Sequence, residues 1–183
     1  TNKMVDVSRL PNDDPPQFYD FGFGTDMVDM YMPIEQVTQV KRNEHTTIYY
    51  DNKMIVFGGY NDTNNHLYDI YEFDLTNNKW DGITPTNDTS PSVGANHASI
   101  YYDNKIVVFG GEKAGGEITN NIWEFDLTNN KWSNIIPTNT SPSARKDHTT
   151  IYYDNKMVVF GGYDGTNRLN EVWEFDLSNN TWL

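Results

Sequence analysis

The pattern of apolar and polar residues occurs three times along the chain and predicts short strands. In the first copy, "TTIYY" (46–50) forms a strand that ends at Asp51 and Asn52, and "KMIVFGG" (53–59) follows. A short, continuous apolar run of this kind predicts a strand buried on both faces. Asp and Asn tolerate positive φ angles, so this pair predicts a two-residue hairpin turn between the two strands.

Two further strands complete each copy. In "NIWEFDL" (121–127), Trp123, Phe125 and Leu127 alternate with Glu124 and Asp126, which places apolar and acidic side chains on opposite faces of a strand. An Asn-Asn turn leads from there into "KWSNI" (131–135). No segment has a sustained helical period, so each copy predicts four antiparallel strands.

The copies are nearly identical. "HTTIYYDNKMIVFGGY" (45–60) and "HTTIYYDNKMVVFGGY" (148–163) differ at one position, and "HASIYYDNKIVVFGGE" (97–112) lies between them at spacings of 52 and 51 residues. Small sheets that are buried on two sides cover one another most simply when they are arranged as a ring. The sequence therefore predicts an all-β propeller with one four-stranded blade for each copy.

Two motifs in these copies resemble the kelch repeat. Glycine pairs close the second strand, and aromatic residues follow at fixed distances: Gly58, Gly59, Gly110, Gly111, Gly161, Gly162, then Tyr71, Trp123, Trp173, then Trp80, Trp132, Trp182. "PSARKDH" (142–148) is similar to the Pro-x-x-Arg-x-x-His opening of many kelch repeats. The five Trp occupy only two repeat positions, so we interpret them as wedges between blades. The resemblance covers residues 41–183 and implies blades at about 41–92, 93–143 and 144–183.

Three blades are too few for a closed ring. Propellers close with about four to eight blades, and the kelch resemblance implies five to seven. Residues 1–40 offer an extended arm or a degenerate half blade. An open arc leaves apolar blade faces bare, so we expect completion by a second copy, by another chain or by sequence outside these residues. The simplest closure is a twofold dimer with six blades.

The two ends of the predicted blades differ in variability. The turns within the hairpins are short and repeat, whereas the loops after the second and fourth strands differ among copies and hold most of the Arg. Arg is enriched in binding hot spots, so these loops predict a surface for a protein partner, in particular an acidic or Tyr-containing peptide. The candidate residues are Arg42, Glu44, Tyr60, Asn96, Lys113, Arg145, Lys146, Asp147, Tyr163 and Arg168. The alternative for Arg42 and Arg145 is that they tie a loop to its own blade.

Composition limits the partners. The chain has a formal charge of −13 and a pI near 4.5, which disfavours nucleic acid and anionic membranes as partners. It has no Cys, which excludes disulfides and thiolate chemistry within this sequence and favours a reducing compartment such as the cytoplasm. We interpret the glycosylation sequons at Asn61, Asn87, Asn139 and Asn179 as accidents of an Asn-rich chain.

No residue pattern indicates catalysis, a cofactor or a metal. His45, His97 and His148 share one repeat position, and stacked sheets place equivalent residues about 10 Å apart, too far for one zinc ion. The repeated "EFD" carboxylates are best explained as support for hairpins. We predict a non-enzymatic interaction module. The alternatives are a purely structural subunit and an enzyme. The kelch resemblance includes copper-radical oxidases, whose cysteine-linked tyrosine needs a Cys, and sialic acid mutarotases. A metal-free epimerase would have to use Asn43, Glu44, Asn96, Arg145, Lys146 and Asp147.

Overall fold

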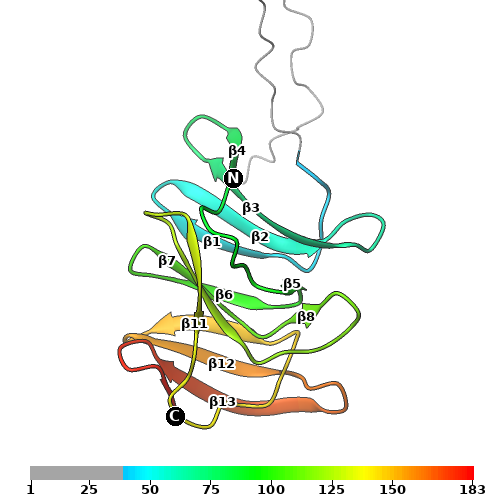
Figure 1. Ribbon diagram of the computed structural model, residues 1–183, viewed down its shortest axis with the longest axis vertical. Helices are drawn as coiled ribbons and strands as arrows, with labels where there is room; N and C mark the ends of the chain where they lie inside the picture. The colour runs from blue at the N-terminus through cyan, green and yellow to red at the C-terminus, as the bar shows by residue number, and fades with distance from the viewer. Residues whose placement is uncertain (1–38) are drawn as a thin grey trace, which may run out of the picture. The chain divides into compact units, whose positions relative to one another are not determined.

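The computed structural model describes residues 39–183, so the arm or half blade expected in residues 1–40 lies almost entirely outside the described part. Within residues 39–183 the backbone forms strands, turns and loops and contains no helix. Three four-stranded antiparallel sheets follow one another along the chain and do not close a ring (Figure 1). This confirms the prediction of an all-β propeller segment with three four-stranded blades.

Each sheet is a meander of four strands in sequence order. The first contains β1 (Thr46–Tyr50), β2 (Lys53–Tyr60), β3 (His66–Asp74) and β4 (Lys79–Ile83). The second contains β6 (Ala98–Tyr102), β7 (Lys105–Phe109), β9 (Ile122–Asp126) and β10 (Lys131–Ile135). The third contains β11 (Thr149–Tyr153), β12 (Lys156–Tyr163), β13 (Arg168–Asp176) and β14 (Thr181–Trp182). A small ladder of β5 (Val93–Ala95) and β8 (Glu112–Lys113) lies beside the second sheet.

The predicted hairpin turns are present. Asp51 and Asn52 have φ angles of 45° and 57°, and the equivalent Asp-Asn pairs of the other two sheets are also left-handed. The last carboxylate of the first "EFD" supports the next hairpin, because Asp74 Oδ1 accepts hydrogen bonds from the backbone amides of Thr76 (2.7 Å) and Asn77 (3.0 Å). These short turns make up one end of every blade, which we call the turn face.

Neighbouring sheets pack through two different faces. The forward face of a sheet meets the sheet that follows, and the backward face meets the sheet that precedes. At the first seam, the forward face of the first sheet (Ile48, Ile55, Phe57, Ile70) packs on the backward face of the second (Ile106, Val108, Trp123, Phe125, Trp132). The rings of Phe57 and Trp132 have centroids 5.0 Å apart. Full burial of a side chain such as Phe57 contributes about 1.5–3 kcal/mol.

The second seam repeats the first with equivalent residues. The forward face of the second sheet (Ile100, Val107, Phe109, Ile122) packs on the backward face of the third (Met157, Val159, Trp173, Phe175, Trp182). Four Trp side chains therefore lie in the two seams, and Trp80 lies half-buried on the backward face of the first sheet.

No sheet formed by residues 39–183 covers the forward face of the third sheet. Ile151, Phe160 and Val172 are 61%, 53% and 57% exposed, although they repeat residues that are buried in the first two sheets. Bare apolar area of this kind was the expected consequence of an open arc.

An asparagine also ties each blade to the next. Asn139 follows the second sheet, and its side chain brackets Trp182 of the third: Nδ2 donates to the carbonyl oxygen (2.7 Å) and Oδ1 accepts from the amide (2.8 Å). Asn87 brackets Trp132 in the same way. The side-chain amides of these two sequons are therefore engaged in holding neighbouring blades together.

Candidate functional site

The variable loops gather at the end of the blades opposite the turn face. This loop face is formed by the loops and adjoining strand ends at residues 41–45, 60–66, 93–97, 112–121, 144–148 and 163–168. The antiparallel meander places them together, because the second strand of each blade ends at the edge where the first strand begins.

An acidic residue joins the three blades on the loop face. Glu112, the first residue of β8, accepts a hydrogen bond from the Tyr60 hydroxyl (2.8 Å) and forms an ion pair with Lys146, which precedes β11 of the third blade. Only 14% of the Glu112 side chain and 22% of the Lys146 side chain are exposed. The Lys146 ammonium group is therefore mostly buried and paired within the protein.

These contacts shift the pKa values of the partners. Burial, followed by the hydrogen bond to Glu112, raises the pKa of Tyr60 to about 12. Burial alone would raise the pKa of Glu112, but the hydrogen bonds from Lys146 and Tyr60 outweigh it and hold that pKa below its usual value. The hydrogen bond to Glu112 raises the pKa of Lys146. All three groups keep one protonation state near neutral pH, so the cluster is suited to holding loops rather than to transferring protons.

Two hollows with basic residues open on the loop face. One, of about 480 Å³, is lined by Lys146, Asp147, Gly162, Tyr163, Arg168 and Leu169. The other, of about 300 Å³, is lined by Lys41, Arg42, Asn43, Tyr60, Asn61, Asp62 and Asn64. A third hollow, of about 530 Å³, lies on the turn face around the Lys53–Glu72 ion pair, at the seam between the first two blades.

Arg168 is the exposed cation of the larger loop-face hollow. It forms no ion pair with any residue in the described range 39–183. It stands opposite Tyr163 in the β12–β13 ladder, where the first blade has His66 opposite Tyr60. There the His66 and Tyr60 rings pack at 4.5 Å, so the third blade substitutes a guanidinium for an imidazole at this place.

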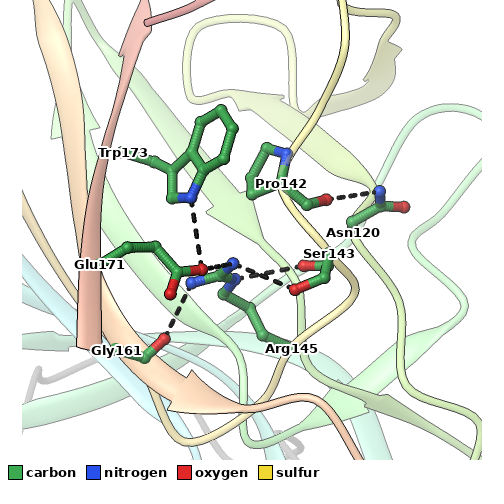
Figure 2. A network of polar contacts seen from close by, with 7 residues as sticks. All are labelled: Asn120, Pro142, Ser143, Arg145, Gly161, Glu171 and Trp173. Carbon is green, nitrogen blue, oxygen red and sulfur yellow. Dashed lines mark hydrogen bonds and ion pairs between the residues drawn. The ribbon is translucent and has the colours of Figure 1, made fainter. Parts of the chain in front are cut away.

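Arg42 and Arg145 share one repeat position. Each side chain forms hydrogen bonds that tie its loop to its own blade, as the alternative interpretation of these two residues expected. Figure 2 shows the Arg145 guanidinium enclosed by Ser143, Gly161 and Glu171, and its side chain is fully buried. Its nitrogens donate to the carbonyl oxygens of Ser143 (3.2 Å) and Gly161 (3.0 Å) and to Glu171 Oε1 (2.8 Å).

Arg42 makes the same type of contacts in the first blade. It donates to the Gly58 carbonyl oxygen (2.9 Å) and pairs with Asp69 (2.7 Å), and only 7% of its side chain is exposed. The guanidinium groups of Arg42 and Arg145 are thus both engaged by carbonyl and carboxylate groups within the chain.

The remaining candidates lie on the loop face in different states. Lys113 is paired with Glu117, and the Tyr163 hydroxyl donates to the Gly165 carbonyl oxygen. Glu44, Asn96 and Asp147 share one repeat position and all have positive φ angles of 53°, 57° and 59°. Their backbones form a ladder across the blades, because the Asn96 amide donates to the Glu44 carbonyl and the Asp147 amide donates to the Asn96 carbonyl, each at 3.1 Å.

Two of the three repeated histidines, His97 and His148, pack into the seams, whereas His45 is exposed. His97 and His148 are 5% and 7% exposed, and their rings lie 4.8 Å from Phe57 and 5.2 Å from Phe109. Burial lowers the pKa of His97 to about 3 and that of His148 to about 4, so both rings are neutral. Residues 39–183 contain no group of three His, Asp or Glu placed to hold a metal ion.

Comparison with known proteins agrees with this geometry. Residues 20–183 match the profile of the KLHDC2/KLHL20/DRC7 Kelch-repeats domain, which covers most of the chain. The chain belongs to the kelch-repeat family.

Curated relatives carry the same repeats. The chain is 31% identical over 135 residues to the leucine-zipper-like transcriptional regulator 1 homolog of Drosophila melanogaster, covering 70% of this chain and 14% of that protein. It is 30% identical over 129 residues to human Kelch domain-containing protein 3 (69% and 33%) and 38% identical over 93 residues to putative protein tag-53 of Caenorhabditis elegans (50% and 7%). The kelch chain thus spans at most 33% of the length of these three relatives.

Glu112 of the loop face was not predicted from the sequence. Glu112 stands where the other two copies have Tyr60 and Tyr163, and this departure from the repeat was the available signal. The described part of the chain also contains no helix with the length and hydropathy that a membrane crossing requires.

Proposed function

We propose that this kelch segment is a non-enzymatic interaction module whose loop face binds an acidic segment of a protein partner. The observation that carries the proposal is the hollow of about 480 Å³ around the exposed Arg168. A guanidinium without an ion-pair partner among residues 39–183, in a chain with a net charge of −13, is a local exception that an acidic ligand would recognise. Membership of the kelch family supports the same class of function.

The lining of this hollow defines the ligand further. Arg168 offers a planar fork that pairs bidentately with a carboxylate, and Tyr163 offers an aromatic ring beside it. Asp147 lies in the same hollow and repels a second carboxylate. The ligand that fits is a peptide with one acidic side chain on Arg168 and a hydrogen-bond donor, such as a Tyr hydroxyl or a backbone amide, near Asp147.

The proposal includes completion of the ring by another copy or another chain. The bare forward face of the third sheet supports it, because the equivalent faces of the first two sheets are buried by a following blade. Loop-face binding depends on the Arg168 side chain, and ring completion depends on the apolar face of Ile151, Phe160 and Val172. Asp147 borders both surfaces, but Arg168 and Phe160 can each be substituted to test one without the other.

The loop-face proposal is tested with peptides that contain Tyr and Glu, compared with Tyr and Gln peptides of the same length. Fluorescence anisotropy should show binding of the acidic set only, weakening as salt is added. Arg168→Glu should weaken this binding at least tenfold. Lys131→Glu, on the exposed turn face, changes the net charge equally and should leave it unchanged. Equal binding by the wild type and Arg168→Glu would contradict the proposal.

A further inference from the structure

We propose that the forward face of the third sheet binds the backward face of the first sheet in a second copy of this chain, so that two copies close head to tail. This inference deepens the proposed ring completion and rests on it. Three observations at the third sheet and two at the first sheet support it, and the two seams within the chain serve as templates.

The first observation is the chemistry of the exposed face. Ile151, Phe160 and Val172 repeat Ile100, Phe109 and Ile122, which are 4%, 0% and 0% exposed in the second seam. The same positions in the first seam, Ile48, Phe57 and Ile70, are 8%, 2% and 2% exposed. The fourth position of this face, Val158, is also apolar and is half-buried. A face that keeps apolar residues at these four seam positions, three of them more than half exposed, has the composition of an interface.

The second observation is the space beside a glycine. A Cβ on Gly58 would lie 2.4 Å from the carbonyl oxygen of Gly94, and one on Gly110 would lie 2.6 Å from that of Arg145, because the loop of the following blade crosses there. At the equivalent Gly161, a Cβ would meet only the carbonyl oxygen of Leu169, at 3.2 Å, which belongs to the same sheet. The space beside Gly161 that the loop of a following blade would occupy is therefore present and unfilled by residues 39–183.

The third observation is the backbone ladder of the loop face. The carbonyl oxygens of Glu44 and Asn96 each accept a hydrogen bond from a backbone amide of the next blade, that of Asn96 and that of Asp147. The Asp147 carbonyl, at the same repeat position, accepts no hydrogen bond from any residue between 39 and 183. The amide of Glu44 likewise donates none within that range, so the carbonyl of one copy and the amide of another are complementary.

The fourth observation is that the first sheet carries the matching backward face. Its residues Val56, Tyr71, Phe73 and Trp80 stand at the positions of Val108, Trp123, Phe125 and Trp132, which fill the first seam. Only Tyr71 departs from the pattern, and it is also aromatic. Leu75 is 49% exposed, whereas its equivalents Leu127 and Leu177 pack against the seams.

The fifth observation concerns tyrosine pairs near the turn face. Each seam contains one pair: Tyr50 with Tyr101 at 5.0 Å and Tyr102 with Tyr152 at 5.4 Å between ring centroids. Continuing the pattern pairs Tyr153 with Tyr49 of the second copy. These two rings are 67% and 65% exposed in one chain.

A head-to-tail contact is the arrangement that these observations favour. The exposed forward face matches a backward face and does not match another forward face, so a face-to-face dimer would leave the Trp positions unfilled. Two copies contribute three blades each, and six blades lie within the range of about four to eight at which propellers close. A heterologous contact that closes after two copies gives a twofold particle without free seams.

The experiment uses cysteine cross-linking, because the wild-type chain has no Cys. Tyr49→Cys and Tyr153→Cys are made separately, and both positions are exposed, so neither change removes a buried contact. A bismaleimide with a reach of about 10 Å spans two stacked sheets. The linker is added to each variant alone and to an equimolar mixture. Ile136→Cys, 70% exposed and on neither face of the proposed seam, is the control.

The proposal predicts a cross-linked dimer in the mixture of Tyr49→Cys and Tyr153→Cys, and at least tenfold less in either variant alone or with Ile136→Cys. Adding Phe160→Asp to the Tyr153→Cys chain should abolish the product while binding of the acidic peptide persists. Cross-linking of Tyr153→Cys with itself would overturn the head-to-tail arrangement, and so would absence of product from the mixture. Retained peptide binding in that case would leave the loop-face function standing.

Discussion

Phe109 and Phe160 occupy the same position in two copies of the repeat, but Phe109 is fully buried and Phe160 is 53% exposed. This pair allows one substitution to be compared in two environments. Phe109→Ala removes contacts with the rings of Trp182 and His148, whose centroids lie 5.0 Å and 5.2 Å away. Removal of a buried Phe side chain costs about 3–5 kcal/mol of the free energy of unfolding, including the cavity that remains.

Phe160→Ala should cost much less in an isolated chain. Exposed substitutions usually change the free energy of unfolding by about 0.5 kcal/mol or less, and the part of Phe160 that contacts its own sheet raises this to about 1 kcal/mol. Domains of this size are stable by about 5–15 kcal/mol, so Phe109→Ala removes a large share and Phe160→Ala does not. With a urea slope of about 2 kcal/mol per molar, the midpoints should differ by about 1–2 M.

The assay is urea unfolding followed by tryptophan fluorescence and far-UV circular dichroism at low and high protein concentrations. At low concentration only Phe109→Ala should lower the midpoint strongly. At high concentration the wild type should become more stable through association, and Phe160→Ala should lose that gain. Equal destabilisation by the two variants in dilute solution would refute the reasoning, because Phe160 would then already be buried within one chain.

Three further predictions follow from buried polar groups. Arg145→Ala should lower the free energy of unfolding by about 3 kcal/mol, because the carbonyls of Ser143 and Gly161 lose their donor, whereas Arg168→Ala should change it by less than about 0.5 kcal/mol in thermal denaturation. His97 and His148 have lowered pKa values of about 3 and about 4, so the unfolded chain binds protons first. The free energy of unfolding should therefore be highest above about pH 6.5. As the pH falls below that value, it should decrease by up to about 1.4 kcal/mol for each histidine and each pH unit. Urea titrations between about pH 6.5 and pH 5 test this, and His97→Gln should reduce the slope by about half. Asn139→Ala should cost about 1–2 kcal/mol by freeing the backbone of Trp182, measured by the same denaturation and compared with exposed Thr140→Ala, which should be neutral.

The strands and hairpin turns could be predicted because their signals are local. The apolar run of 53–59 and the Asp51-Asn52 pair each specify their own conformation, and repetition provides three independent examples of the same pattern. The alternation of Trp123 and Phe125 with Glu124 likewise determined which side chains face a neighbouring sheet.

The roles of the loop-face residues depended on contacts between distant segments, which a local pattern does not specify. A guanidinium suits both a partner's carboxylate and an internal carbonyl, so the sequence could not indicate that Arg145 donates to the Gly161 carbonyl at 3.0 Å. Glu112 contacts Tyr60, 52 positions away, and Lys146, 34 positions away. Its departure from the repeat marked the residue, but no spacing rule indicated these two partners.

The molecular mass in solution tests the central claim most directly, namely that the exposed forward face of the third sheet is a blade interface. Sedimentation equilibrium of the 183-residue chain should give a concentration-dependent mass that approaches twice that of one chain. Phe160→Asp should remain at the mass of one chain throughout, and Ile136→Asp should behave as the wild type does. A wild-type chain that keeps the mass of a single copy at every concentration would contradict the account.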